Sequence, residues 1–233
     1  MGRVGEQSDV WRWTRTRRAG DAHSPTMDPR ARAGVDGTFL THVRAPVGAV
    51  ARASTLERAL ETVRDAFVDD VDDGRGTGEG HVSMSKPFAT RAEDWETMRA
   101  GVRKELRGME AIEVTFDALR VFVNEDETRA FVAAGFREGS ERGDKRALVR
   151  AIERVNRALE PLGFPRYFDD PDPHVSLLSM TRLGRERVDE LRRRVESMDV
   201  GEWRVKVNRI VVDISGQPQK TVWGRAPLPA PDL

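Results

Sequence analysis

Apolar residues between about residue 37 and residue 228 recur with two spacings, one typical of helices and one typical of strands. Spacings of three and four residues predict helices at 54–67, from Thr90 or Glu93 to 108, at 148–159 and at 185–198. Alternation and short apolar runs predict strands at 38–46, 81–83, 113–123, 128–136, from 174 onward, 203–214 and 220–228. This mixture predicts an α+β fold, with antiparallel sheets and flanking helices.

The order strand, helix, His-x-Ser strand, helix, strand occurs twice along the chain. Apolar residues stand 14, 17 and 21 positions after His81, and again 14, 17 and 21 positions after His174. The copies are offset by 92 residues before the histidine and by 93 from it onward. Such self-similarity predicts an internal duplication, with repeats at about 38–124 and 128–228 in one domain at 37–228. The alternative is two unrelated strands, each with a hydrogen-bonded histidine.

Residues 1–36 differ in composition from the rest of the chain. A basic segment containing Trp11 and Trp13 is followed by a stretch rich in Gly, Pro, Ala and Arg, which is typical of disorder. The simplest interpretation is a disordered tail with no specific role. The alternatives are an RNA-contacting arm, a nuclear address and a transit peptide, although acidic residues argue against the last. The Pro-rich residues 229–233 are a second predicted tail.

Charge and cysteine content limit the classes of function. The 39 basic and 39 acidic side chains give a formal net charge of zero, so bulk charge does not indicate a nucleic-acid binder. Charged residues make up 33% of the chain, so the composition is compatible with a local patch of basic surface. The lack of Cys excludes disulfides, zinc–thiolate sites and thiol catalysis, and it fits an intracellular protein. No apolar run approaches the length of a membrane span, and we expect no membrane partner.

The two His-x-Ser segments contain the candidate catalytic residues. Residues i and i+2 of a strand share a face, so His81 and Ser83 point one way, as do His174 and Ser176. Two duplicated lobes would bring the four side chains together at one cleft. One neutral imidazole can take a proton from an attacking hydroxyl, while the other, as imidazolium, protonates the departing oxygen. Serine hydroxyls would donate to the nonbridging phosphate oxygens. In RNA the attacking group can be the neighbouring 2′-OH, which needs no metal.

Other chemistries fit these residues less well. A serine nucleophile needs a His base at hydrogen-bond distance and an orienting carboxylate, whereas each Ser here lies two positions from its His along a strand. A metal site would need more ligands than two histidines, and Asp169, Asp170 and Asp172 are the candidates. His42 lies on an apolar strand without a Ser partner, which indicates a packed core or edge residue. His23 belongs to the exposed tail.

The two segments resemble those of the 2H phosphoesterase superfamily. Many members have Thr at the third position, and Ser at that position is similar to the U6 snRNA phosphodiesterase branch. The resemblance extends over residues 37–228, and its most similar segments are residues 38–43, 81–85, 167–171, 174–177 and 207–212.

The resemblance implies both a fold and an activity. The fold would be two-lobed and pseudo-two-fold, with a central catalytic cleft. The activity would be that of a metal-independent 3′–5′ exoribonuclease, which trims the oligouridine tail of U6 snRNA in the nucleus and leaves a 2′,3′-cyclic phosphate or a 3′-phosphate. His81 and His174 would be the acid–base pair, and Ser83 and Ser176 would bind the phosphate. We expect the partner to be the uridine-rich 3′ end of a single-stranded RNA, bound by a monomer without a cofactor or metal.

One loop departs from the branch. A Tyr that stacks on a base usually stands six residues before the second His, whereas this chain has Phe168 there, preceded by Tyr167. Pro173 directly precedes His174, where an aromatic or other side chain is common. We expect Phe168 or Tyr167 to stack on the terminal base, the alternative being that both rings are core residues. A 2H cyclic-nucleotide phosphodiesterase or RNA ligase-like enzyme, and a non-catalytic RNA-binding module, are the alternative functions.

Overall fold

Strands and helices alternate along the part of the chain that the computed structural model describes, which is residues 37–47, 54–72, 80–124, 127–181 and 183–224. In chain order the elements are β1 (Thr38–Pro46), α2 (Ser54–Ala66), β2 (His81–Ser83), β3 (Phe88–Arg91), η2 (Ala92–Asp94), α3 (Trp95–Glu105), β4 (Ile112–Phe116), β5 (Ala118–Val123), β6 (Arg129–Gly135), α4 (Gly143–Leu159), η3 (Glu160–Leu162), β7 (Val175–Thr181), α5 (Arg185–Glu196), β8 (Trp203–Val207), β9 (Arg209–Ile214) and β10 (Lys220–Gly224). The predicted tails, residues 1–36 and 229–233, lie outside the described residues.

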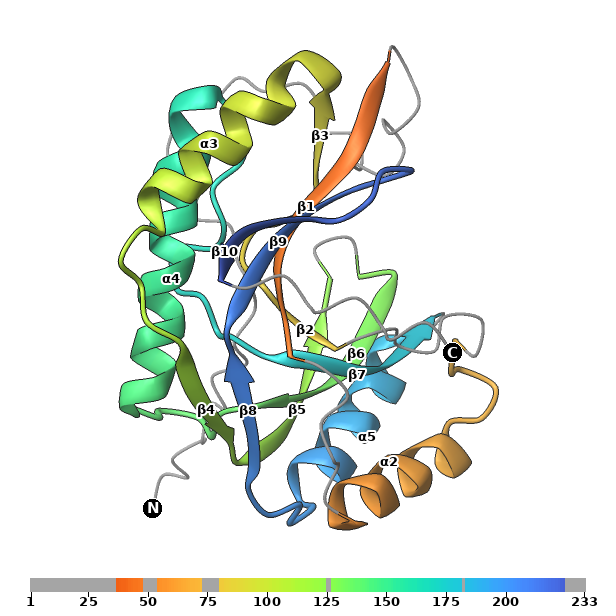
Figure 1. Ribbon diagram of the computed structural model, residues 1–233. Helices are drawn as coiled ribbons and strands as arrows, with labels where there is room; N and C mark the ends of the chain where they lie inside the picture. The colour runs from red at the N-terminus through yellow and green to blue at the C-terminus, as the bar shows by residue number, and fades with distance from the viewer. Residues whose placement is uncertain (1–36, 48–53, 73–79, 125–126, 182, 225–233) are drawn as a thin grey trace, which may run out of the picture.

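Eight of these strands form one antiparallel sheet (Figure 1). Their order is β10-β9-β1-β2-β7-β6-β5, and β3 pairs with β1 beside this path. The strands β4 and β8 form a separate two-stranded sheet. Since every strand pair is antiparallel and helices flank the strands, the predicted α+β fold is confirmed.

The two halves of the chain are interwoven around the contact between β2 and β7. The strand β9, from the second half, pairs with β1 from the first, and β5 pairs with β6 in the converse way. The helices follow the same rule, since α3 packs against α4 and α2 against α5 (Figure 1). Each helix pair therefore combines one helix from either half. The repeat bounds at 38–124 and 128–228 stay a prediction.

The helices bury the apolar stripe that predicted them. In α4 the side chains of Leu148, Ile152, Val155 and Leu159 are almost fully buried, at the spacing of one helix face. The helix begins at Gly143, five residues before the predicted start. Its first turn is polar, so the hydrophobic period does not reveal it. A tertiary contact supports this turn, because the backbone N–H of Thr115 donates to the carboxylate of Asp144 at 2.9 Å.

Two predicted strands are each divided in the structure. The expected strand at 113–123 breaks at Asp117, and the expected strand at 203–214 breaks at Asn208. In both cases the first part enters the β4–β8 sheet and the second part joins the large sheet. The buried positions change phase at each break, from even to odd numbers around Asp117 and from odd to even numbers around Asn208. A shift of one residue is a weak signal in a short alternating run, and the prediction joined the two parts. At Asp117 the chain is fixed by tertiary contacts, since its backbone N–H donates to Gly135 and its carboxylate accepts from the backbone of Arg137.

The strand β3 was not predicted from the sequence. It lies within the stretch where a helix was expected to begin at Thr90 or Glu93, and the helix α3 begins only at Trp95, after the turn η2. The strand has two buried residues, Phe88 and Thr90, whose spacing fits a strand. A run of four residues is too short to show a period of two against the helical pattern that follows it.

Candidate active site

The two His-x-Ser segments meet where β2 pairs with β7. Val82 stands opposite Val175 in this antiparallel contact, and both valine side chains are fully buried. Extending the register by one residue in each direction places His81 opposite Ser176 and Ser83 opposite His174. Because alternate residues share a face, the four side chains lie together on the side of the sheet away from the valines. We call these four residues the quartet, and this side of the sheet the quartet face.

The spacing within the quartet suits one phosphate group. His81 and His174 are diagonal neighbours across the two strands, a relation in which the residues are about 7–8 Å apart. Each His therefore has a Ser directly opposite it on the neighbouring strand and the other His diagonally across from it. All four residues are half-buried, so the side chains remain accessible to a ligand. The predicted convergence of the quartet thus arises from neighbouring strands of one sheet.

The close approach of β7 to β2 depends on Gly80, which precedes His81. A Cβ atom at this position would lie 3.3 Å from Cγ1 of Val175 and 3.4 Å from Cγ2 of Val47. Contacts this short require the neighbouring side chains to move. The backbone carbonyl of Gly80 also accepts a hydrogen bond from the N–H of Val47, at 2.9 Å. A side chain at position 80 would therefore press on Val175 of β7 and on Val47, at the junction that holds the quartet.

His174 is oriented by a hydrogen bond from its ring. Its Nδ1 lies 2.8 Å from the backbone carbonyl oxygen of Asp172. Since a carbonyl only accepts, Nδ1 must carry the hydrogen. In the neutral ring the lone pair is then on Nε2. The loop that supplies the carbonyl is itself held, because the carboxylate of Asp172 pairs with Lys145 at 3.3 Å.

The surroundings of His174 favour its neutral form. Burial lowers the pKa of His174 below its ordinary value, and the positive charge of Arg120 acts in the same direction. The hydrogen bond to the Asp172 carbonyl and the negative charge of Asp172 oppose this effect. The lowered pKa leaves Nε2 free to accept a proton at neutral pH.

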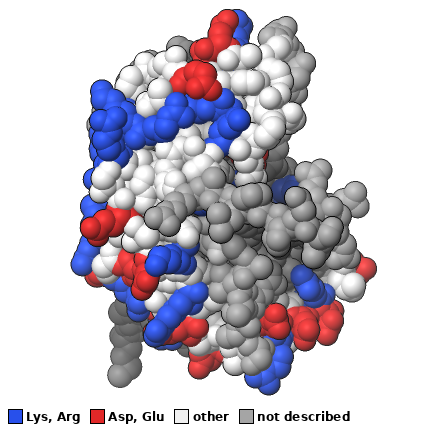
Figure 2. All heavy atoms as spheres, in the orientation of Figure 1, with Lys and Arg blue, Asp and Glu red and all other residues white. Residues whose placement is uncertain are grey.

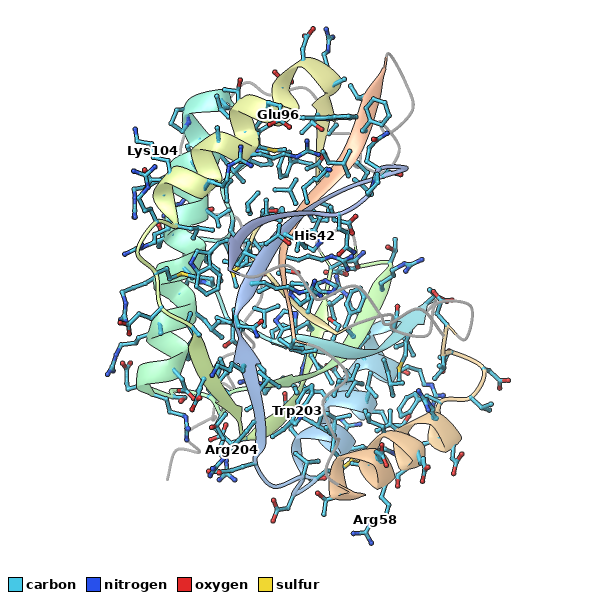
Figure 3. The ribbon with its side chains drawn as sticks, viewed as in Figure 1. His42, Arg58, Glu96, Lys104, Trp203 and Arg204 are labelled. Carbon is cyan, nitrogen blue, oxygen red and sulfur yellow. The ribbon has the colours of Figure 1, made fainter. Side chains whose placement is uncertain are left out.

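Aromatic side chains flank both histidines, in different geometries. The ring of Phe122, in β5, stacks on the ring of His174 with centroids 3.8 Å apart and an angle of 15° between the planes. The ring of His42, in β1, meets the ring of His81 edge-on at 5.4 Å and 79°. Figure 3 shows His42 near the middle of the molecule. The prediction that His42 is a packed residue did not include this contact.

Two arginines lie on the quartet face beside the four residues. Arg44 stands opposite Ser83 across β1 and β2, and its guanidinium pairs with Asp213 of β9 at 2.7 Å. Arg120 approaches from β5 and donates to the carbonyl of Phe136 at 3.1 Å. Both arginines are positions that a sequence pattern could not link to the quartet, since the link depends on strand register. The face drawn in Figure 2 has mixed charge, with a basic band over α3, where Arg103 and Lys104 occupy the last turn.

The two candidate stacking residues differ in exposure. Tyr167 is 8% exposed, and its backbone N–H donates to the fully buried Asn156 at 2.9 Å. Burial raises the pKa of the Tyr167 hydroxyl far above its ordinary value. Phe168 is half-buried, and the ammonium of Lys86 lies 4.1 Å from the centre of its ring. Of the two rings, Phe168 therefore has the surface that a base could contact.

Neither a metal-binding cluster nor a membrane-spanning helix is present among the described residues. The part of the chain that the structure describes contains no group of three or more His, Cys, Asp or Glu side chains placed to hold a metal ion. The alternative ligands Asp169, Asp170 and Asp172 thus do not form such a group with the histidines. Among the described helices, none has the length and apolar content needed to cross a membrane.

Comparisons with known proteins identify the family. The profile of HVSL, described as "Uncharacterised conserved protein", matches residues 27–220. The chain belongs to the HVSL family. The four letters of the family name are the one-letter codes of residues 174–177, the second segment of the quartet.

Relatives of this HVSL protein include a phosphodiesterase. U6 snRNA phosphodiesterase 1 of Dictyostelium discoideum is 29% identical over 98 residues, which are 42% of this chain and 34% of that relative. The match thus spans about a third of the relative's length. Kluyveromyces marxianus Usb1 has a similar structure, with a TM-score of 0.55 and 16% identity over 79% of this chain and 97% of that one. The same protein with uridine monophosphate gives a TM-score of 0.52 and 16% identity over 80% and 97%. The predicted resemblance is confirmed, and the solved structures show a shared fold.

Proposed function

We propose that this HVSL protein is an RNA phosphodiesterase that removes nucleotides one at a time from the 3′ end of single-stranded RNA. The observation that carries the proposal is the β2–β7 contact, which puts two histidines and two serines on one face of a sheet. The likeness to a U6 snRNA phosphodiesterase supports an RNA substrate. The uridine monophosphate in the second Usb1 structure supports a uridine-rich 3′ end, as in U6 snRNA.

The reaction that suits the quartet uses the 2′-OH of the penultimate nucleotide. His174 accepts the 2′-OH proton on Nε2, because its Nδ1 is already occupied by a hydrogen that binds Asp172. The 2′ oxygen forms a bond to phosphorus, and the bond from phosphorus to the 5′ oxygen of the terminal nucleoside breaks. His81, as imidazolium, protonates that 5′ oxygen. The products are a terminal nucleoside and an RNA that ends in a 2′,3′-cyclic phosphate.

The serines and Phe168 would hold the substrate during this step. Ser83 and Ser176 each stand opposite one His, so their hydroxyls donate to the nonbridging oxygens, where negative charge grows in the transition state. Phe168 stacks on the terminal base with its exposed surface. Water can then open the cyclic phosphate with the acid and base roles exchanged, which gives a 3′-phosphate. From the likeness to a U6 snRNA phosphodiesterase we also propose that the protein acts in the nucleus, and we propose that it acts as a monomer.

One experiment separates this function from the alternatives. The purified protein is incubated in EDTA with RNAs that have uridine tails of increasing length, and the ends are identified by mass spectrometry. We expect stepwise shortening, with more efficient cleavage of longer tails than of uridylyl-uridine dinucleotide. Equal turnover of the dinucleotide, or of 2′,3′-cyclic UMP, would indicate a small-molecule phosphodiesterase. Binding without cleavage would indicate an RNA-binding module. Either result would contradict the proposed exoribonuclease.

A further inference from the structure

We propose that Phe122 is a positioning residue for His174, which fixes the plane of the imidazole from which the base acts. The two rings are nearly parallel, with 15° between their planes and 3.8 Å between their centres. The other ring pairs among the described residues are tilted or edge-on, with angles of 38° or more. The contact between Phe122 and His174 therefore differs in kind from ordinary core packing of aromatic rings.

The stacked ring supplies a restraint that the hydrogen bond of His174 lacks. The bond from Nδ1 to the Asp172 carbonyl fixes one atom of the ring, at 2.8 Å. A single hydrogen bond leaves the ring able to tilt about the bond axis. A parallel ring against the face removes this tilt, because rotation would bring the ring edges into Phe122. Together the two contacts define both the position of Nε2 and the direction of its lone pair.

Between β5 and His174, the part of the intervening strand at Ala133 and Gly135 has small residues on the quartet face. The strand β6 lies between β5 and β7. Its Ala133 pairs with Arg120 on one side and with Ser176 on the other. At Gly135 a Cβ atom would lie 3.3 Å from Cγ of Arg120 and 3.8 Å from Cβ of His174. The small residues Ala133 and Gly135 thus leave room for side chains of β5 to extend across β6 toward His174.

The consequence for catalysis rests on the proposed function. A general base must point its lone pair at the hydroxyl hydrogen, and hydrogen bonds weaken steeply as they bend. Loss of the stacked ring should therefore lower kcat, since a tilted imidazole accepts the proton less well. It should leave KM unchanged, because Phe122 is placed against His174 and makes no contact that the proposal assigns to RNA. The ring of His81 meets His42 edge-on, whereas Phe122 stacks on His174, so the effect should be specific to His174.

The test combines kinetics with NMR of the histidine ring. We expect Phe122→Leu to lower kcat about ten- to hundredfold, part of the 10² to 10⁴ that a general base supplies, and Phe122→Tyr to restore most of it. The matched control is Phe131→Leu, whose ring lies directly opposite Phe122 across β5 and β6, and which should keep wild-type kcat. In the wild type the ring protons of His174 should be shifted upfield by the Phe122 ring, and this shift should vanish in Phe122→Leu.

The NMR signal keeps the two proposals distinguishable. An upfield shift that is absent from the wild type, or one that persists in Phe122→Leu, would overturn the positioning role. So would equal losses of kcat in Phe122→Leu and Phe131→Leu. If Phe122→Leu did not fold, the wild-type shift and the activity of Phe122→Tyr would decide. A protein that shows the shift but cleaves no RNA would refute the proposed function and keep the structural restraint on His174.

Discussion

At the scale of single residues, the two histidines of the quartet have different surroundings. The His174 ring is hydrogen-bonded at Nδ1 and stacked on Phe122, whereas the His81 ring meets the edge of His42. Burial also lowers the pKa of His174. The quartet is therefore symmetric in residue type and register but not in environment. This difference is the physical basis for giving the base role to His174 and the acid role to His81.

Replacing either histidine of the quartet should remove most of the activity. We expect His81→Ala and His174→Ala each to lower kcat by about 10² to 10⁴, the usual contribution of one acid or base. The double variant should lose little more, because the two groups act as one unit. Single-turnover kinetics on a uridine-tailed RNA would measure this, with circular dichroism as the control for folding. Full activity of either single variant would reject the assignment.

The lowered pKa of His174 predicts a pH dependence of stability. Folding favours the neutral ring, so protonation costs free energy in the folded state that it does not cost in the unfolded state. The free energy of unfolding should therefore fall as the pH drops from the ordinary value of 6.5 toward the lowered pKa. Urea unfolding of the wild type and of His174→Asn at several pH values would measure it. The two proteins should diverge below pH 6.5, and parallel curves would contradict the prediction.

Phe168 and Tyr167 should respond differently to truncation. Phe168→Ala should weaken RNA binding by up to the value of one stacked base, about 1–3 kcal/mol, with little change in the melting temperature. Tyr167→Ala should instead lower stability by about 3–5 kcal/mol, as expected for a buried aromatic side chain. Fluorescence anisotropy and thermal unfolding would measure the two effects. Wild-type RNA affinity in Phe168→Ala would place the stacking surface elsewhere.

At the scale of elements, the pairing of β2 with β7 is the feature on which the site depends. Only one described residue pair, Val82 with Val175, joins the two strands. The strand β2 also pairs with β1, and directly after β2 the backbone N–H groups of Met84 and Ser85 both donate to the carbonyl of Val43. The contact between the two halves of the quartet is therefore narrow, and steric changes at β2 should affect activity strongly.

Gly80→Val tests this narrow contact. The new side chain would press on Val175 and Val47, and overpacking of this kind costs about 1–3 kcal/mol. We expect lower stability and a larger loss of kcat, because the strands that hold the quartet separate. Gly143→Ala is the control. A Cβ atom there meets nothing within 4 Å, and the residue begins the helix α4. A Gly80→Val enzyme with wild-type kcat would show that the junction tolerates displacement.

Sequence patterns predicted some elements well and others incompletely. The strand β1 has its predicted bounds, and the helix α5 follows from apolar spacings of three and four residues. The divisions at Asp117 and Asn208 were not predicted, although the buried positions change phase there by one residue, because a shift of one residue in a short run does not show that the two parts enter different sheets. The quartet was predictable since its spacing repeats along the chain. The contacts of Phe122 and His42 with it were not, because they depend on strand order and register.

At the scale of the whole molecule, the interwoven halves explain how two short segments come together. The strands β2 and β7 are the innermost pair of the large sheet, and the outer strands on each side come from both halves of the chain. The pairs β1–β9, β2–β7 and β5–β6 join strands of different halves. The quartet is thus assembled only when the complete domain folds, although its residues lie 93 positions apart in the sequence.

The central claim is that the quartet cleaves RNA by using the substrate's own 2′-OH. The most direct measurement is the cleavage, in EDTA, of a uridine-tailed RNA with a single 2′-deoxy substitution at the penultimate nucleotide. A matched RNA has the substitution at the terminal nucleotide, whose 2′-OH takes no part in the first step. We predict that the penultimate substitution blocks removal of the last nucleotide. The terminal substitution should leave this removal unaffected, and the shortened RNA should end in a cyclic phosphate. Equal cleavage of both RNAs would contradict the mechanism.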